Sequence, residues 1–302
     1  MTARAASGQT RPASLDRMAL VRRLDDRAAV RERLAIAPAY AAYASAYLDL
    51  RFFPLANFYE ATLGLRWALV MHARGGLGTS TLTLGDAAIV EALMRLHPAP
   101  RQTFLTCDPS HVDGLLTGYN LWRPQTMLRM QVGRAGFAPK GNAAGVRRLI
   151  DADAADLNAL YAIEGDGLRY SGRQISRGVY FGAYVRGRLV SAAGTHIHSA
   201  SERVAVVGNV FTHPDHRGRG LGTAVTSAVT GQLLRACDHV VLNVDPANRT
   251  ARHIYEELGY TEAGRLVEAM ATRRDALSPL PLVRRFLGRW RSGTPGVESI
   301  AL

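Results

Sequence analysis

The sequence predicts an α+β fold, in which helices cover a mixed sheet. Segments with strand character alternate with segments whose apolar residues recur at helical spacing. The 302 residues are enough for one large or two medium domains, each with its own core. No uninterrupted apolar run approaches the roughly 18 residues that a membrane-spanning helix needs. We therefore expect a soluble protein without a membrane span.

The first half of the chain predicts a helix followed by a β-β-α-β-α-β unit. We expect residues 1–24 to be a disordered leader and the first helix to run from Asp25 to about Asp49. Asp86 is a typical N-cap residue for the next helix. The Gly75–Gly78 segment lies between two strands, so it predicts a hairpin turn and not a second phosphate loop. The expected strands are 63–72, 79–84, 102–107 and 122–132, and the expected helices 86–96 and 110–119.

A basic, glycine-containing segment at residues 136–144 predicts a linker, after which strands and helices alternate again. Arg186-Gly187 predicts a hairpin turn between two of the later strands, and the segment 165–178 is irregular and polar. The expected strands are 146–150, 179–185, 189–198, 203–212, 238–245 and 265–271. The expected helices are 153–164, one with an apolar stripe from Leu221 to Leu233 that Cys237 closes, and one that carries Asn248 and Tyr255.

Residues 203–223 are the most informative part of the chain. An apolar strand leads into a proline turn, a loop of alternating Arg and Gly, and then a helix. Unpaired amides at a helix N-terminus attract anions, and the glycines at 218, 220 and 222 let a phosphate approach the main chain. The spacing is neither the Gly-x-Gly-x-x-Gly of dinucleotide-binding folds nor a Walker loop, which needs a Lys. The segment predicts a pyrophosphate site.

This segment resembles motif A of the GNAT superfamily, the N-acetyltransferases that use acyl-coenzyme A. The signature Arg/Gln-x-x-Gly-x-Gly/Ala is met by Arg217, Gly220 and Gly222. One helix and one strand later, a second segment resembles motif B of the same family. Its pattern is met by Asn248, Ala251, Tyr255, Gly259 and Tyr260.

The resemblance covers residues 145–272 and implies a GNAT acetyltransferase domain there, with acetyl-CoA as acyl donor and no metal. Element order alone suggests that residues 25–135 form a degenerate, GNAT-like N-terminal domain, which gives a tandem arrangement. Residues 273–302 are then a basic tail. The implied activity is transfer of an acyl group to a primary amine by direct attack in a ternary complex.

In the GNAT family the strand before the phosphate loop separates from its neighbour and binds the pantetheine arm of the cofactor. The resemblance places that strand at Val210–Thr212 and the pyrophosphate on the loop amides, with Arg217 and Arg219 offering charge-assisted bonds. The cofactor-binding residues that it implies are Val210, Phe211, Thr212, Arg217, Gly218, Arg219, Gly220, Leu221, Gly222, Thr223 and Asn248.

Asn248 and Tyr255 lie seven residues apart, two helical turns, and so share one helix face. The resemblance makes Asn248 a contact to the cofactor arm and Tyr255 the acid that protonates the departing sulfur. Asn248 also suits an N-cap after Pro246, and the two roles can coexist. The alternative for Tyr255 is a residue that only fills the core.

The general base is where the chain departs from the family, because the strand stretch 204–208 carries no Glu. Glu202 lies just upstream, where we expect it to be solvent-exposed. His196 lies mid-strand with a suitable ordinary pKa, and strand alternation predicts that it shares a face with His198. His196 is our candidate base, with a structural histidine as its alternative. Asn209 is the candidate that would orient a relaying water.

Two residues of the irregular segment, Asp166 and Tyr170, are weaker candidates for substrate recognition. Two cysteines, Cys107 and Cys237, form neither a disulfide framework nor a metal site, and we expect both to be buried. The cysteine content fits a reducing cytoplasm.

The formal net charge is +12, almost all of it from arginine, since Lys140 is the only lysine. Such a charge attracts an anionic cofactor or nucleic acid, but an arginine-rich composition also follows from a GC-rich coding sequence. No strand or helix typical of RNA or DNA recognition is present, which argues against nucleic acid.

The tail holds a basic amphipathic stretch at residues 280–291 with a tryptophan. This pattern allows a helix on a membrane surface, but we favour a helix packed on its own protein or left solvated. Gly288 and the two flanking prolines weaken any long helix here.

Two rival functions fit the same sequence. One is a non-catalytic module that binds acyl-CoA as a sensor, which the missing Glu favours. The other is an acyltransferase for a nucleic-acid-linked substrate, which only the charge suggests. The acceptor, a small-molecule or peptide amine, is not specified by the sequence, nor are the acyl length and a homodimeric state.

Overall fold

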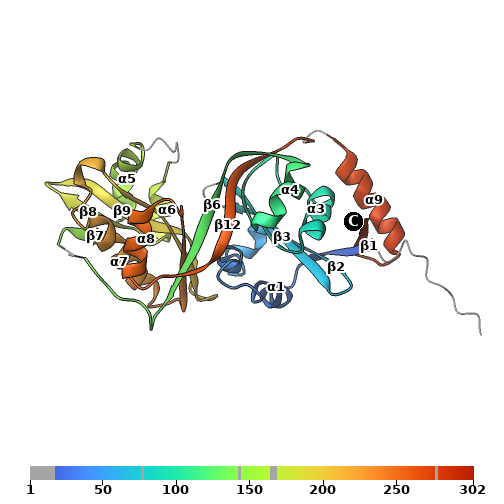
Figure 1. Ribbon diagram of the computed structural model, residues 1–302, viewed down its shortest axis with the longest axis horizontal. Coiled ribbons are helices and arrows are strands. Elements are labelled where there is room, and N and C mark those ends of the chain that lie inside the picture. Colours follow the sequence, from blue (N-terminus) through green and yellow to red (C-terminus); the bar gives the residue numbers. More distant parts are fainter. Residues whose placement is uncertain (1–17, 76–77, 142–143, 164–168, 276–277) are drawn as a thin grey trace, which may run out of the picture.

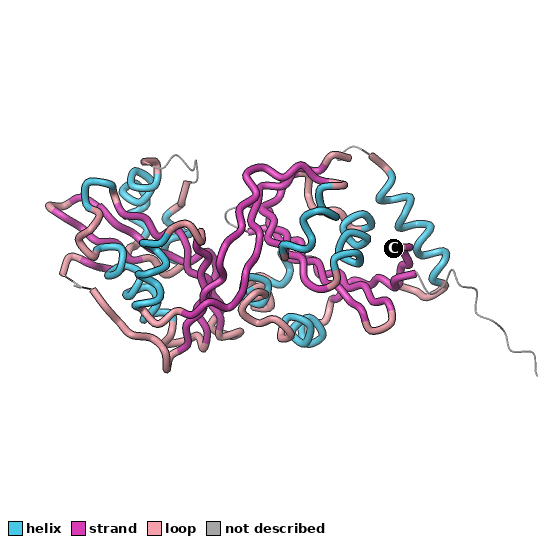
Figure 2. The backbone as a smooth tube through the Cα atoms, viewed as in Figure 1, coloured by secondary structure: helices cyan, strands magenta, loops and turns pink. Residues whose placement is uncertain are grey.

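The computed structural model describes residues 18–75, 78–141, 144–163, 169–275 and 278–302. The strands of this part form one continuous sheet flanked by helices (Figures 1 and 2). The strands are β1 Met18–Leu24, β2 Ala56–Leu63, β3 Arg66–Gly75, β4 Gly78–Gly85, β5 Gln102–Cys107, β6 Tyr119–Gly133, β7 Val146–Arg148, β8 Phe181–Val185, β9 Arg188–Ser199, β10 Val204–Thr212, β11 His239–Val244, β12 Thr261–Arg273 and β13 Val297–Ala301. The helices are α1 Arg27–Leu34, α2 Ala42–Ala46, α3 Ala87–Leu96, α4 Val112–Leu116, α5 Ala154–Tyr161, α6 Gly172–Arg177, α7 Leu221–Leu233, α8 Arg249–Glu257 and α9 Leu280–Ser292.

The strand order is β13-β1-β2-β3-β4-β5-β12-β6-β11-β10-β9-β8-β7. The two longest strands, β6 and β12, lie side by side between the two halves of the molecule (Figure 1). The strand β6 also pairs with β11, and β12 also pairs with β5. The last strand of the C-terminal half therefore enters the sheet next to a strand of the N-terminal half. The two halves share one hydrogen-bonded sheet.

Local sequence explains where several helices begin. Asp86 caps α3, because its carboxylate accepts hydrogen bonds from the amides of Ala88 and Ile89 at 3.1 and 3.2 Å. The hairpin expected at residues 75–78 is confirmed by the pairing of Gly75 with Gly78 across β3 and β4. Its two central residues lie outside the described ones.

The C-terminal half of the sheet is covered on both faces. On one face, Ala205 and Val207 of β10 pack in a core with Val225 and Val229 of α7. On the other face, the residues that alternate with these along each strand pack against the N-terminal half, because successive side chains of a strand point to opposite faces of the sheet. These residues, Ile197, Val204, Val206 and Val241, join a core that also holds Ala44, Leu48 and Phe58. The two halves thus share apolar packing as well as strand pairing.

Some sequence expectations need correction. Met18–Leu24, placed in the disordered leader, form β1, which pairs with β2 and β13; residues 1–17 lie outside the described residues. The helix expected from Asp25 to Asp49 is two helices, α1 and α2. The segment 165–178, expected to be irregular, contains α6, and β2 was not predicted. These elements depend on partners distant in sequence, which local periodicity does not report. The domain boundaries themselves stay a prediction.

Replacing Leu48 by Ala tests whether the shared core holds both halves together. Leu48 is 1% exposed, so the truncation leaves a cavity that should lower the free energy of unfolding by about 2–5 kcal/mol. Both halves should unfold together in chemical denaturation followed by circular dichroism. The matched control is Leu65→Ala, since Leu65 is fully exposed and should leave stability unchanged. Two separate transitions in the wild type would contradict a shared core.

Candidate active site

Strand β10 separates from β11 partway along its length. The parallel pairing runs from Val204↔His239 to Val207↔Leu242 and stops there, although β10 continues to Thr212 and β11 to Val244. The pairing of β10 with β9 is also interrupted, between Gly208 and Phe211. Main-chain groups of the second half of β10 are therefore not used in the β10–β11 ladder. This is the stretch that the resemblance assigns to the pantetheine arm.

Asn209 lies at this interruption in a left-handed conformation, with φ 54°. Non-glycine residues adopt that conformation rarely, and Asn is among the most tolerant. Two tyrosines hold the residue in place. The Tyr161 hydroxyl donates to the Asn209 carbonyl at 2.6 Å, and the Asn209 side-chain amide donates to the Tyr170 hydroxyl. The structure therefore brings Asn209 and Tyr170 together, but Asp166 lies outside the described residues.

The loop before α7 presents a row of free amides. Gly218 and Gly220 have φ values of +72° and +71°, which strain any residue with a Cβ, and Gly220 is the N-cap of α7. Among the described residues, the amides from Gly218 to Thr223 donate no hydrogen bond to the protein. The N-terminus of α7 therefore has the unsatisfied donors and the positive dipole end that bind anions.

The two loop arginines lie beside these amides and are exposed. The guanidinium of Arg217 donates to the Thr212 carbonyl at 3.1 Å, and that of Arg219 donates to the Asp215 carbonyl at 3.2 Å. Gly222 lies close to β10, because an added Cβ would be 3.3 Å from the Thr212 hydroxyl. The structure therefore brings the predicted phosphate loop against the end of β10, next to the stretch where that strand leaves β11.

Helix α8 contains the two predicted residues of the second motif. The Asn248 side chain accepts a hydrogen bond from the Ala251 amide at 3.0 Å, so its N-cap role is confirmed. Tyr255 is 6% exposed and lies in the core under α7. Its hydroxyl makes no hydrogen bond to the described part of the chain, and burial raises its pKa to about 12. The cofactor contact of Asn248 and the acid role of Tyr255 stay predictions.

His196 lies at a bulge in β9. His198 pairs with Ala205 and Ile197 with Val206, but Thr195 pairs with Val207, so His196 is an extra residue. Its imidazole lies over Gly208, where an added Cβ would be 1.9 Å from Nε2. His198 shares the face of Ala205, on the α7 side. The expectation that His196 and His198 share one face is therefore wrong, because the bulge breaks the alternation.

The environment of His196 keeps the ring neutral. The side chain remains accessible to solvent, but the protein around it lowers its pKa to about 4, first by burial and then by the charge of Arg129. Glu202, expected to be solvent-exposed, is held by Arg31 of α1 in an ion pair of 2.8 Å, and the carboxylate is mostly covered.

Sequence reasoning missed a buried polar cluster beside His196. Arg129 of β6 is 2% exposed and pairs in register with Asn243, the residue that follows the last β10–β11 pair. Its guanidinium donates to the Tyr40 carbonyl at 3.4 Å, while Nε and Nη1 have no partner among the described residues. Asn243 donates to Glu268 at 2.5 Å, and burial raises the pKa of Glu268. The sequence signal that could have indicated this cluster was an arginine inside the mainly apolar run at residues 127–132.

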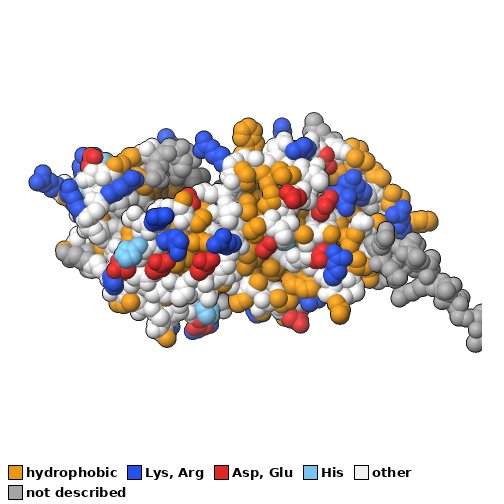
Figure 3. Space-filling model, in the orientation of Figure 1, with side chains coloured by type: hydrophobic (Ala, Val, Ile, Leu, Met, Phe, Trp, Pro, Cys, Tyr) orange, Lys and Arg blue, Asp and Glu red, His pale blue; other side chains and the backbone are white. Residues whose placement is uncertain are grey.

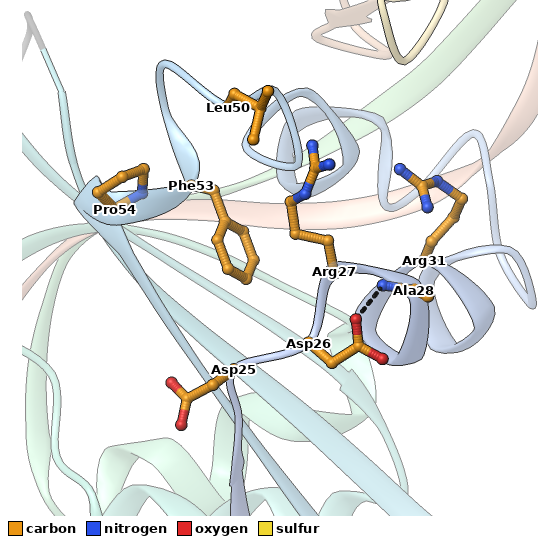
Figure 4. Close-up of a pocket in the computed structure, with 8 residues that line it drawn as sticks. All are labelled: Asp25, Asp26, Arg27, Ala28, Arg31, Leu50, Phe53 and Pro54. Carbon is orange, nitrogen blue, oxygen red and sulfur yellow. Dashed lines mark hydrogen bonds between the residues drawn. The ribbon is translucent and has the colours of Figure 1, made fainter.

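Other features of the surface lie away from this site. A hollow in the N-terminal half is lined by residues of the α1 start and the 50–54 segment, where Asp26 caps α1 through the Ala28 amide (Figure 4). A second hollow lies between α3, α4 and the start of α9.

No group of three potential metal ligands occurs in the described part of the chain. Among the helices described, none is long and apolar enough to cross a membrane.

Comparison with known proteins gives several matches. Residues 180–271 match the family model described as FR47-like protein. Over 87 residues the chain is 39% identical to the mycothiol acetyltransferase of Thermobispora bispora, a match that covers 27% of this chain and 30% of that protein. Over 89 residues it is 27% identical to the L-amino acid N-acyltransferase MnaT of Escherichia coli K12, covering 29% and 44%. The chain thus spans less than half the length of these curated relatives.

A solved structure shows a similar fold over most of the molecule. A GCN5-related N-acetyltransferase from Sphaerobacter thermophilus superposes with a TM-score of 0.50 at 15% identity, covering 84% of this chain and 95% of that one. That coverage includes both halves of the sheet. The fold is that of the GCN5-related acetyltransferases. The two motifs around Gly220 and Tyr255 both lie within residues 180–271, the part of the chain that matches the family model.

The electrostatic coupling of His196 can be measured by NMR. Its imidazole should titrate near pH 4 in the wild type. In Arg129→Met the pKa should rise, because the repulsion by the buried cation is lost, but should stay below 6.5 because burial is the larger cause. Arg265→Met, which removes an exposed arginine, is the control and should change nothing. A wild-type value near 6.5 would contradict the desolvated site.

Proposed function

We propose that this chain is an acetyl-CoA-dependent N-acetyltransferase that transfers the acetyl group to a primary amine by direct attack in a ternary complex. The observation that supports this most strongly is one continuous segment. Its strand leaves the β10–β11 ladder after Val207, and its loop then presents the amides from Gly218 to Thr223, which donate to no acceptor in the described part of the chain. An extended chain ending in a diphosphate, the shape of coenzyme A, matches that order of groups.

When bound, acetyl-CoA supplies the activated thioester. The residues of this chain would bind the cofactor and transfer the protons. The loop amides and the guanidiniums of Arg217 and Arg219 would bind the diphosphate, and the main chain of Val210 would bind the arm as an added strand. The cap uses the side-chain oxygen of Asn248, so the NH₂ group, which has no acceptor among the described residues, would be its donor to the arm.

Tyr255 is suited to give a proton to the departing sulfur. With a pKa of about 12 it is protonated at neutral pH, and its hydroxyl has no competing partner in the described part of the chain. The hydroxyl would donate its proton to the sulfur as the carbon–sulfur bond breaks, and the phenolate left behind would regain a proton from solvent.

His196 is our proposed acceptor of the amine proton. Its low pKa keeps it neutral at physiological pH, so one ring nitrogen is a hydrogen-bond acceptor. Glu268, with its raised pKa and its place beside Arg129, is a second carrier for that proton. Asn209, held by two tyrosines, is positioned to orient a water between amine and base.

The name of the Escherichia coli relative states an L-amino acid as acceptor, and we propose a small primary amine for this chain. We further propose a cytoplasmic location, where acetyl-CoA is available and where the free, buried Cys107 and Cys237 stay reduced.

Gly220→Glu tests the diphosphate site. A carboxylate at the helix N-cap opposes the diphosphate, so the Kd for acetyl-CoA in calorimetry should rise by about 100-fold or more. The matched control is Gly64→Glu, since Gly64 has a similar φ of +59° and also has open space around its Cβ position. Unchanged affinity in Gly220→Glu would remove the cofactor assignment.

Tyr255→Phe tests the acid. Removing the hydroxyl should lower kcat roughly 10²-fold, because the leaving thiolate loses its proton donor, while the Kd for acetyl-CoA changes little. Tyr260→Phe is the control, since the Tyr260 ring lies 6.0 Å from that of Tyr255 in a tilted arrangement and its hydroxyl bonds to Thr230. If acetyl-CoA binds tightly but no amine in a broad panel is acetylated, the chain is a sensor and not an enzyme.

A further inference from the structure

Helix α9 is attached to the protein by its smallest side chains. Pro281 and Gly288 are its buried residues. Gly288 lies directly on β13, because an added Cβ would be 2.8 Å from the Ser299 carbonyl oxygen. The Ser299 hydroxyl donates to the Gly288 carbonyl at 3.2 Å. An ordinary surface helix packs its large apolar residues inward, and α9 does the opposite.

The large apolar side chains of α9 face outward. Three of them are spaced four residues apart and so lie along one face: Leu282, Phe286 and Trp290 are 66%, 71% and 78% exposed. At 100° per residue, the outward apolar residues span an arc of roughly 160° opposite Gly288. The full set is Leu280, Leu282, Val283, Phe286, Leu287 and Trp290, which we call the α9 stripe. Hydrophobic side chains are visible over α9 at that end of the molecule in Figure 3.

Arginines border the α9 stripe on both sides. By the same helical rotation, Arg285 and Arg289 lie along one edge, and Arg284 and Arg291 along the other. The helix contains no acidic residue. A long arginine side chain at such a boundary can lie along apolar surface while its charged end reaches outward.

The helix is held in this orientation by a buried carboxylate. Glu298 of β13 accepts from Arg285 at 3.3 Å and from Arg289 at 2.9 Å, and it also contacts His97 at 2.6 Å. Strand β13 in turn pairs with β1. The outward direction of the α9 stripe is thus fixed by an ion-pair network and by sheet pairing.

We propose that α9 is an interfacial helix that docks this protein on an anionic lipid surface. The α9 stripe would enter the boundary between headgroups and acyl chains, and Arg284 and Arg291, which are not part of the Glu298 network, would contact lipid phosphates. Charge decides between possible occupants. A second copy of the chain would bring a similarly basic helix and a net charge of +12 against this one, which disfavours self-association. With 13 residues, α9 is too short to span a bilayer.

Vesicle flotation of the full chain tests this proposal. We expect partitioning onto phosphatidylcholine vesicles that contain about 30% phosphatidylglycerol to exceed that onto pure phosphatidylcholine by about tenfold, and to fall at high salt. The double variant Phe286→Ser/Trp290→Ser should lose at least about tenfold in binding to the anionic vesicles. The control is Trp122→Ser, because Trp122 is similarly exposed, at 67%, but lies on β6.

Equal binding to the two kinds of vesicle, or full binding by the double variant, would overturn the proposal. Dimerisation in analytical ultracentrifugation that the double variant abolishes would also overturn it, in favour of a second copy. Acetyl transfer to a soluble amine should be the same in the double variant and the wild type. The lipid result is therefore independent of the proposed enzyme function.

Discussion

The early end of the β10–β11 ladder is the constraint on which the rest of the site depends. Two parallel neighbours that paired along their whole length would leave no main-chain group for a ligand. Because the pairing ends at Val207 and Leu242, the second half of β10 can turn toward α7. The bulge at Asn209, held by Tyr161 and Tyr170, keeps the strand from closing the ladder again. The separation is built by specific contacts on the opposite side of the strand.

The same separation places the polar cluster. Asn243 is the first β11 residue beyond the pairing, and Arg129 is its partner on β6. A buried guanidinium with two nitrogens that lack a partner in the described part of the chain is costly, and its field acts on His196 and Glu268. This electrostatic arrangement requires the N-terminal half as well, since the Tyr40 carbonyl is the hydrogen-bond partner of Arg129. The N-terminal half is therefore part of the site's environment, whatever its own ancestry.

The sequence was sufficient to predict the local part of this site. The order strand, glycine loop, helix, and the cap at Asn248, depend on residues a few positions apart, and both are present in the structure. The bulge at His196 could not be predicted, because it arises from how β9 meets β10. Nor could Glu202 be placed, since its partner Arg31 is 171 residues away in the chain. Strand β1 depends likewise on β13 at the opposite end of the sequence.

In helix α9 the same residues disfavour a helix in the sequence and support its packing in the structure. In the sequence, Gly288 and the prolines weaken the pattern of a long amphipathic helix. In the structure, Pro281 lies in the first turn, where a missing N–H costs little, and Gly288 lies at the point of contact with β13. The residues that disfavour the helix locally are the ones that let its narrow face approach the sheet closely. Because the narrow face of α9 packs against β13, the wide apolar face points away from the protein.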